Sequence, residues 1–250
     1  MIQARGVRFG FGGRTVLEDI TIDIEESLTT VIVGRSGIGK SVFLRCLTGL
    51  LRPQAGSITI DGQEVVGASR DALLAIRRRI GMLFQEGALF DSMTVYENVA
   101  FPLAYHKSAT AREIDARVLA YLDLVELRDY AHAMPQELSG GMKRKVAVAR
   151  AMILEPRYLL YDEPTAGLDP SSSAVVESMI RRLQRERAIT SLVVTHDIEL
   201  TRYIADRIAL MEDGRISARA GRDEAFAEPS AIYEHFIENR ERIRAENGQG

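Results

Sequence analysis

The sequence has one cysteine, no long apolar run and no excess of charge of one sign, and each shortage excludes a class of protein. Cys46 alone cannot form an internal disulfide, which suits a reducing compartment. No apolar run approaches the ~20 residues that a membrane-spanning helix needs, and residues 1–13 lack the apolar core of a secretory signal. We therefore expect any membrane role to come through a partner. Because 32 basic residues stand against 35 acidic ones, for a net charge of -3, the chain as a whole has no strong electrostatic reason to bind nucleic acid.

What is present is the composition of an ordinary globular protein, with 250 residues, 46% of them hydrophobic and 27% charged. β patterning occupies the N-terminal part, with expected strands at 2–11, 18–24, 29–33 and 57–60. The centre of 29–33 is apolar and β-branched, which predicts a strand buried on both faces. A helix is expected to follow at 40–51, with Cys46 as a core residue.

Helical spacing dominates residues 88–157, with expected helices at 94–106, 111–127 and 140–154. Strand signals return at 158–161 and 191–194 on either side of an amphipathic helix at 172–187, which predicts a βαβ unit of a parallel sheet. A further strand is expected at 208–211 and a charged helix at 230–247. The pattern therefore predicts an α/β fold with a helical insert.

A glycine-rich motif lies directly after the predicted buried strand and directly before the predicted helix. It fits G-x-x-x-x-G-K-[ST] at every fixed position, over Gly34, Arg35, Ser36, Gly37, Ile38, Gly39, Lys40 and Ser41. Glycines let the backbone wrap closely around a phosphate, and the N–H groups of a helix N-terminus attract it. We expect Lys40 to reach the β- and γ-phosphates and Ser41 to ligate Mg²⁺. The alternative is a glycine-rich turn that binds no ligand.

Two adjacent carboxylates, Asp162 and Glu163, follow the apolar strand predicted at 158–161. Open α/β sheets bind ligands beyond the C-terminal ends of their strands, and successive side chains of a strand point apart. We expect Asp162 to face the metal through water and Glu163 to act as a general base on the attacking water. His196 follows the next predicted strand, where it could touch the γ-phosphate. For each of these residues the alternative is a structural polar group at a strand end.

These residues together resemble the nucleotide-binding subunit of ATP-binding-cassette (ABC) transporters, over nearly the whole chain. The segment Leu138-Ser139-Gly140-Gly141-Met142 looks like the family's LSGGQ signature and lies shortly before the acidic strand, as the family requires. Met142 departs from the usual glutamine, which removes a side-chain amide but no backbone contact. The resemblance implies one ABC ATPase domain with a P-loop NTPase fold and an N-terminal antiparallel β-subdomain. That fold has a RecA-like parallel-sheet core. The expected parts of the chain are a nucleotide-binding core at 1–87 and 157–222, an α-helical signature subdomain at 88–156 and a C-terminal helical extension at 223–250.

The resemblance also implies roles for residues outside the phosphate loop. Gln85 matches the Q-loop glutamine that contacts metal and attacking water, Ala166-Gly167-Leu168-Asp169 matches the D-loop, and His196 matches the switch histidine. Phe11 occupies the position of the aromatic residue that stacks on adenine, and its alternative is a core strand residue. The implied catalytic residues are Glu163, His196, Gln85 and Lys40. The implied Mg²⁺ ligands are Ser41, Gln85 and Asp162, and the implied ATP contacts are Phe11, Gly34, Arg35, Ser36, Gly37, Ile38, Gly39, Lys40, Ser41, Val42, Gln85, Ser139, Gly140, Gly141, Asp162, Asp169 and His196.

The signature residues form a second candidate anion site, because Ser139, Gly140 and Gly141 open a predicted helix. In the family two copies pack head to tail, so that the signature of one copy covers the γ-phosphate held by the phosphate loop of the other. The resemblance therefore implies a homodimer that sandwiches two ATP molecules with Mg²⁺.

Residues 83–103 resemble the ATPases of Mla-type, MCE-linked systems, which move phospholipids or other hydrophobic molecules between the membranes of Gram-negative bacteria. Residues 137–142 support the same branch. The implied partners are an integral-membrane permease dimer (MlaE-like), a periplasmic MCE-domain protein (MlaD-like) and, in many such systems, a STAS-domain subunit (MlaB-like). The implied location is the cytoplasmic face of the bacterial inner membrane. In the family a permease helix docks near 83–103, so Leu89, Phe90 and Met93 form either its socket or part of the core of the insert.

The sequence thus predicts the ATP-hydrolysing motor of a lipid transporter, with two alternatives. A nutrient importer for amino acids, sugars or metal ions would carry the same ATP motifs. A non-transport ABC protein that acts on DNA or the ribosome would carry a long coiled coil or two cassettes, and 250 residues with one phosphate loop leave room for neither.

The ATPase motifs assign no role to three segments, which are the basic runs at 77–79 and 143–145 and the C-terminal residues 230–250. We interpret the basic runs as solvated helix faces, with contact to anionic lipid headgroups as the alternative. We interpret residues 230–250 as a solvated helix rather than an arm that reaches a second ATPase.

Overall fold

The structure is a computed structural model that describes residues 1–85, 87–107, 109–235 and 237. The chain divides into two compact units. The first comprises Met1–Val66 and Val194–Gly250, and the second comprises Gly67–Val193. From residue 238 onward, the tail helix expected at 230–247 and the extension expected at 223–250 lie outside the described residues.

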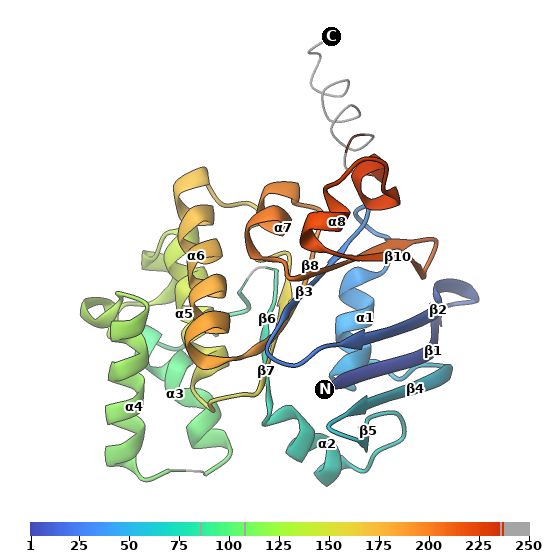
Figure 1. The fold of residues 1–250 in the computed structure, drawn as a ribbon. Coiled ribbons are helices and arrows are strands. Elements are labelled where there is room, and N and C mark those ends of the chain that lie inside the picture. Colours follow the sequence, from blue (N-terminus) through green and yellow to red (C-terminus); the bar gives the residue numbers. More distant parts are fainter. Residues whose placement is uncertain (86, 108, 236, 238–250) are drawn as a thin grey trace. The chain divides into compact units, whose positions relative to one another are not determined.

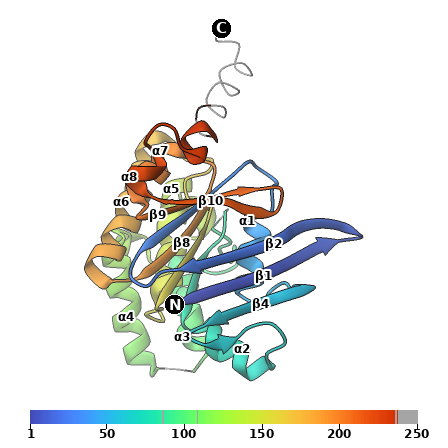
Figure 2. The same ribbon diagram turned by 45° about the vertical axis from the view of Figure 1, so that its right-hand side comes forward.

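An antiparallel β-sheet occupies the N-terminal part of the first unit (Figure 2). Ile2 of its middle strand pairs with Ile24 on one side and with Ile60 on the other. Alternate apolar side chains of the sheet are buried, as expected of a sheet with one covered face. The strands are β1 (Ile2–Phe11), β2 (Arg14–Ile24), β4 (Ala55–Ile60) and β5 (Gln63–Glu64). The expected N-terminal antiparallel subdomain is confirmed.

The remaining strands of the first unit bring the buried strand β3 (Thr29–Val33) next to β9 (Arg207–Glu212). These two strands are parallel, with Val31 opposite Ile208. All five residues of β3 are buried, which confirms the expected central strand. Strand β10 (Arg215–Gly221) is antiparallel to β9 and meets β2, so the order within this unit is β5-β4-β1-β2-β10-β9-β3. Its helices are α1 (Lys40–Leu47), α7 (Ile198–Ile204) and α8 (Arg222–Ala225).

The second unit contains the strand order β8-β7-β6, with β6 and β7 parallel. Position 81 in β6 requires glycine, because a Cβ atom there would collide with the carbonyl oxygen of Ala151. Ala151 lies on α5 (Gly140–Met152), the helix that begins at the signature residues and is called the signature helix below. The close approach of that helix to β6 therefore depends on glycine. The strands are β6 (Ile80–Leu83), β7 (Tyr158–Asp162) and β8 (Thr190–Thr195), the last of which runs across the boundary between the units.

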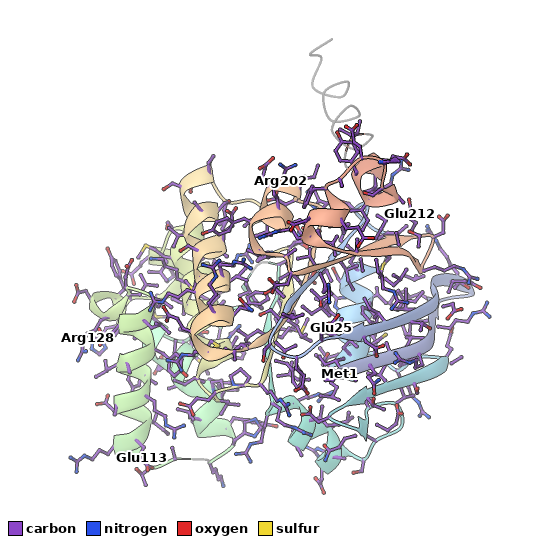
Figure 3. The ribbon with its side chains drawn as sticks, in the orientation of Figure 1. Met1, Glu25, Glu113, Arg128, Arg202 and Glu212 are labelled. Carbon is purple, nitrogen blue, oxygen red and sulfur yellow. The ribbon has the colours of Figure 1, made fainter. Side chains whose placement is uncertain are left out.

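Helix α5 is the centre of the helical part of the second unit (Figure 1). It packs against α3, α4 and α6 as well as against β6. Capping boxes begin two of these helices, with Thr94 and Glu97 at α3 and with Thr110 and Glu113 at α4, where Figure 3 labels Glu113. The expected helical insert is confirmed. The helices of the unit are α2 (Arg70–Arg77), α3 (Val95–Tyr105), α4 (Ala111–Leu124), α5 (Gly140–Met152) and α6 (Pro170–Arg187), with 3-10 turns η1 (Arg128–Tyr130) and η2 (Pro135–Glu137).

The structure shifts several expected boundaries, each for a local reason. The helix expected at 40–51 ends at Leu47, and Gly49 follows it with φ +66. The helix expected at 172–187 begins at Pro170, because the Asp169 side chain caps it. The short elements α2, β6, β10 and α7 were not predicted. Among the described residues, the structure contains no helix that is both long enough and apolar enough to span a membrane.

Candidate nucleotide-binding and catalytic site

The phosphate-loop motif forms the turn between β3 and α1 in the first unit. Gly37 has φ +78 and Gly39, which precedes α1, has φ +112, so the turn uses left-handed backbone that favours glycine. A Cβ atom on Gly34 would lie 2.5 Å from the carbonyl oxygen of Met211, so this position also excludes a side chain. Arg35, Ser36 and Gly37 at the tip are exposed. The glycines therefore form a tight loop that ends at the open N-terminus of an α-helix, and this arrangement fits a bound phosphate.

Lys40 closes this loop from the inside. Its side chain is only 5% exposed, and its Nζ donates hydrogen bonds to the carbonyl oxygens of Gly34 at 2.7 Å and Arg35 at 3.1 Å. A buried ammonium group needs such acceptors because desolvation of a charge is costly. Lys40 therefore places a positive charge within the loop where the motif predicts the phosphates. Ser41 and Val42 follow it in the first turn of α1, both half-buried.

Phe11 and His196 are both exposed side chains of the first unit. Phe11 ends β1 with 52% of its surface exposed, and its ring meets that of Phe9 edge to face at 4.8 Å. The alternative that Phe11 is a core residue is therefore wrong, because Phe9 is the buried member of the pair. His196 lies between the end of β8 and Asp197, whose carboxylate caps α7 by accepting from the N–H of Leu200 at 3.0 Å.

The acidic pair lies at the C-terminal end of β7 in the second unit. Asp162 is the last residue of the strand and is 3% exposed, and Glu163 is 8% exposed in the turn that follows. Glu163 has φ +46, a left-handed conformation that costs a non-glycine residue ~1–2 kcal/mol. Glu163 thus lies in a strained turn that follows the strand, while Asp162 is the last residue of the strand itself. Strain of this kind is concentrated at functional sites in proteins.

The signature and the D-loop lie together in the second unit, because α5 and α6 pack against each other there. Ser139 caps α5 by accepting from the N–H of Met142 at 3.3 Å, and Ser139 and Gly140 are exposed. A Cβ atom on Gly141 would lie 2.7 Å from the Ser172 hydroxyl oxygen. Gly141 is therefore required by its own chain, quite apart from any ligand.

Asp169 holds that same serine in place. Its carboxylate accepts a hydrogen bond from the Ser172 hydroxyl at 2.6 Å and another from the Ser172 N–H at 2.9 Å. These hydrogen bonds to Ser172 lower the pKa of the Asp169 carboxyl below its ordinary value of 3.8. The D-loop thus ends in an ionised cap that also fixes the residue against which Gly141 packs.

Arg144 was missed by the sequence analysis, and the interpretation of 143–145 as a solvated face is wrong for this residue. Its side chain is 5% exposed and turned inward from α5. Nη1 donates to the carbonyl oxygen of Phe84 at 2.9 Å and also to that of Gln85, and Nη2 donates to that of Ala166 at 3.2 Å. The structure therefore joins the Q-loop, the signature helix and the D-loop within one unit. A spacing argument along α5 could have found Arg144, because Val148, four residues on, is also buried.

A second arginine of α5 fixes the residues after Gln85. Arg150 donates from Nη1 to the carbonyl oxygen of Ala88 and from Nη2 to that of Gly87, both at 2.8 Å. Its guanidinium also lies 5.7 Å from the centre of the Phe90 ring. The segment on either side of Gln85 is thus attached to the same helix twice.

An exposed aromatic surface follows, formed by Phe90, Phe101 and Tyr105. Phe90 is 40% and Tyr105 58% exposed, and the Phe101 ring lies 4.8 Å from that of Phe90 and 5.9 Å from that of Tyr105. Buried Asn98, also missed by the sequence analysis, shapes this loop: its Oδ1 accepts from the Phe90 N–H at 2.8 Å, and its amide nitrogen lies 3.0 Å from the Met93 carbonyl. Leu89 and Met93 are half-buried. Phe90 therefore contributes exposed surface, whereas Leu89 and Met93 are partly covered, so the core alternative is excluded for Phe90 alone.

The structure also bears on metal binding and on the single cysteine. Within the described part of the chain, no group of three or more His, Cys, Asp or Glu side chains could hold a metal ion. A Mg²⁺ ion bound mainly by nucleotide phosphates, water, a hydroxyl and one carboxylate needs no such group. Cys46 is fully buried, and burial raises the pKa of its thiol to about 12, so it is a core residue as expected.

Comparison with known proteins identifies the family. The ABC transporter family profile matches residues 17–166. The intermembrane phospholipid transport ATP-binding protein MlaF of Haemophilus influenzae is 40% identical over 218 residues, which cover 87% of this chain and 83% of that protein. MlaF of Escherichia coli K12 is 37% identical over 95% of this chain and 88% of its own. The probable ribonucleotide transport ATP-binding protein mkl of Mycobacterium leprae is 38% identical over 96% of this chain and 69% of its own.

Solved structures give the same result for the fold. The dimeric ATP-binding cassette MJ0796, in a post-hydrolysis state with ADP and Pi, matches with a TM-score of 0.81 and 32% identity, over 89% of this chain and 99% of that one. The cbiO1 protein of Clostridium perfringens, part of the transporter complex cbiONQ, matches with a TM-score of 0.82 and 30% identity, over 93% of both chains. The chain therefore belongs to the ABC transporter family, as an ATP-binding subunit that hydrolyses ATP.

Proposed function

We propose that this chain is the motor subunit of a bacterial inner-membrane transporter that moves phospholipid or other hydrophobic molecules between the inner and outer membranes. The observation that carries the proposal is the 37–40% identity to MlaF proteins over most of both chains. Both relatives are named as ATP-binding proteins of an intermembrane phospholipid transport system. The resemblance of residues 83–103 to Mla-type ATPases supports the same cargo.

We propose the following roles for the first unit. Phe11 offers its exposed ring to adenine, and the loop from Gly34 to Val42 binds the phosphates through N–H groups and the Lys40 ammonium. His196, exposed after β8, senses the γ-phosphate. The support is that the side chains of Phe11 and His196 are exposed and that Lys40 lies inside the loop.

In the second unit, we propose that Glu163 is the general base that polarises the attacking water. Gln85 contacts the metal and the attacking water, and Asp169 belongs to the D-loop contact with nucleotide. Ser139, Gly140 and Gly141 bind a γ-phosphate through the exposed N-terminus of α5. We further assign residues 88–156 as the signature subdomain and 1–87 with 157–222 as the nucleotide-binding core.

Ser41, Gln85 and Asp162 are the proposed Mg²⁺ ligands. Their oxygen donors are the kind that Mg²⁺ prefers, and the absence of an all-protein metal cluster among the described residues suits an ion that is held largely by phosphates. Bound Mg²⁺ would neutralise charge that develops on the transferred phosphoryl group.

We propose that two copies complete each other's sites. Ser139 and Gly140 are exposed at the start of α5, where they can meet a ligand held by a second copy. The matched cassette MJ0796 is dimeric in its ADP and Pi state. The proposed ATP-sandwich homodimer follows from these two observations.

The proposed membrane partner is an MlaE-like permease dimer, which brings the chain to the cytoplasmic face of the inner membrane. Phe90, Phe101 and Tyr105 supply an exposed aromatic surface for a permease helix. An MlaD-like MCE-domain protein and, in systems that have one, an MlaB-like STAS-domain subunit complete the proposed assembly.

Purification of the intact complex in detergent, followed by mass spectrometry of its proteins and lipids, tests the proposal. We expect a permease, an MCE-domain protein and enriched phospholipid. Phe90→Glu should abolish copurification of the permease, whereas Tyr130→Glu, at an aromatic residue that is 46% exposed elsewhere in the second unit, should not. A soluble solute receptor for amino acids, sugars or metal ions in place of the MCE protein would contradict lipid transport and favour a nutrient importer. Bound ribonucleotide other than ATP or ADP would contradict it in favour of the cargo named for mkl.

A further inference from the structure

The buried guanidinium of Arg144 lies among three segments of the second unit that are distant in sequence. It emerges from the second turn of α5 and is 5% exposed. Burial of a charge is tolerated only where hydrogen-bonding partners replace water, and here the partners include three backbone carbonyl oxygens. Two of them belong to Phe84 and Gln85, directly after β6, and the third belongs to Ala166 after the acidic pair.

The geometry of the group matters because its two nitrogens serve different segments. Nη1 donates to the Q-loop carbonyls and Nη2 donates to the Ala166 carbonyl. A planar guanidinium fixes the directions of both nitrogens at once, which the single ammonium of lysine cannot do. The main chain at Gln85 and the main chain of the D-loop are therefore held at a set distance from each other and from α5.

Other contacts reinforce the same arrangement from either side. Arg150 holds the residues after Gln85, through the carbonyls of Gly87 and Ala88. At the start of the helix, Gly141 packs against Ser172, which Asp169 holds by two hydrogen bonds. Arg144 contacts both the Q-loop and the D-loop, whereas these contacts of Arg150 and Gly141 each restrain only one of them. We therefore expect the loss of Arg144 to let the Q-loop and the D-loop move independently of each other.

We propose that Arg144 is a positioning residue of the ATPase reaction: through backbone carbonyls it keeps the Q-loop glutamine and the D-loop in register with the signature helix, so that the three move as one block. The inference rests on the proposed function, because the roles of Gln85, Asp169 and the signature are assigned there. Arg144 itself touches no reacting atom. Its effect is on the placement of groups that do, and a misplacement of ~1 Å can cost about 10²-fold in rate.

The test uses the full-length chain in its membrane complex, with Arg144→Ala and Arg144→Lys. For Arg144→Ala we expect kcat to fall by about tenfold or more. The KM for ATP should change less than about threefold, because the phosphate loop that binds ATP is formed by other residues. Added guanidinium ion should restore several-fold activity to this variant and none to the wild type. Arg144→Lys should remain impaired, because its ammonium cannot serve both segments.

Arg182→Ala is the matched control, since this exposed arginine of α6 pairs with Glu186 on the same helix. It should keep its kcat and show no response to guanidinium. The proposal is overturned if Arg144→Ala and Arg144→Lys both keep kcat within twofold, or if a loss of kcat in folded Arg144→Ala shows no response to guanidinium. If Arg144→Ala does not fold, Arg144→Lys decides: unchanged kcat overturns the proposal, and a reduced kcat with an unchanged unfolding temperature supports it.

Glu163→Gln in the same preparation separates this inference from the proposed function. Loss of turnover in Glu163→Gln with normal turnover in both Arg144 variants would overturn only the positioning role. Normal turnover in Glu163→Gln would instead contradict the proposed catalytic assignment on which the inference rests.

Discussion

The phosphate loop of the first unit and the Q-loop, signature and D-loop region of the second unit are built in different ways. The phosphate loop consists of consecutive residues, and its shape comes from glycine backbone and one lysine that binds carbonyls within six residues of itself. The second region collects segments near residues 84, 141 and 166, and side chains of one helix join them. The comparison teaches that a local site can be recognised from a motif, whereas an assembled site depends on residues that no motif includes.

Glu163→Gln should give the largest change in activity, and it should distinguish the second region, which we expect to govern turnover, from the phosphate loop, which we expect to govern ATP binding. We expect turnover to fall by at least ~10²-fold, the usual scale for loss of a general base, because an amide cannot accept the proton. ATP binding should survive, since the phosphate loop is unchanged. Steady-state hydrolysis and equilibrium binding of radiolabelled ATP measure the two quantities, and near-normal turnover would remove Glu163 from this role.

Lys40→Met should instead weaken ATP binding, because it removes the lysine of the phosphate loop. A charge-assisted hydrogen bond contributes roughly 1.5–3 kcal/mol, so we expect affinity for ATP to fall about 10- to 100-fold. Calorimetric titration with ATP measures the change. The control is Lys107→Met, at an exposed lysine before α4, which should bind ATP as the wild type does. Equal affinity in the two variants would contradict the placement of Lys40 at the phosphates.

Gly141→Ala tests whether the second region is held by contacts within one chain. The added Cβ would lie 2.7 Å from the Ser172 hydroxyl oxygen, and overpacking of this kind costs about 1–3 kcal/mol of unfolding free energy. Gly140→Ala is the matched control, because its Cβ would meet only the end of the Leu168 side chain, at 3.4 Å. Urea unfolding of the isolated chain gives both values. Equal stability of the two variants would show that the Ser172 contact does not constrain Gly141.

Asp169→Asn should alter the acid dependence of stability. The folded-state pKa of Asp169 is lowered by its hydrogen bonds with Ser172, so the carboxylate stabilises the fold above its ordinary pKa of 3.8. This stabilisation is lost as the pH falls through the lowered folded-state value. The wild type should therefore lose more stability than Asp169→Asn when the pH falls below about 4. Urea midpoints at pH 3 and pH 6 measure the difference, and Asp213→Asn, at a turn between β9 and β10, controls for removal of one negative charge.

Tyr161→Phe should give the smallest effect, although the residue is fully buried in β7 beside the acidic pair. Within the described residues its hydroxyl makes no hydrogen bond of ordinary geometry, and the Ser191 hydroxyl is the polar group that interacts with it, so its removal loses little bonding and avoids a desolvation cost. We expect the free energy of unfolding to change by less than about 1 kcal/mol. A larger loss, measured by urea unfolding, would reveal a bound water on the hydroxyl.

The sequence predicted those parts of the fold whose signal is local. Buried β3 was predicted because Val31 to Val33 form a continuous β-branched apolar run, and α5 was predicted from the helical spacing of residues 140–154. Strand β10 was not predicted, since its side chains alternate between exposed and half-buried and give little hydrophobic signal. Helices α2 and α7 were missed for a related reason, because seven or eight residues contain barely two turns of the helical period.

The sequence by itself determined the phosphate loop, the acidic pair, the signature and the family, because each depends on residues close together along the chain. Only the tertiary structure decided that Arg144 is buried, that Gly141 packs against Ser172 and that Phe11 rather than Phe9 is exposed. Contacts between distant segments arise when elements pack, and a side chain on α5 has the same sequence neighbours whether it faces solvent or a backbone carbonyl 60 residues away. For that reason the assembled region had to be seen in the structure.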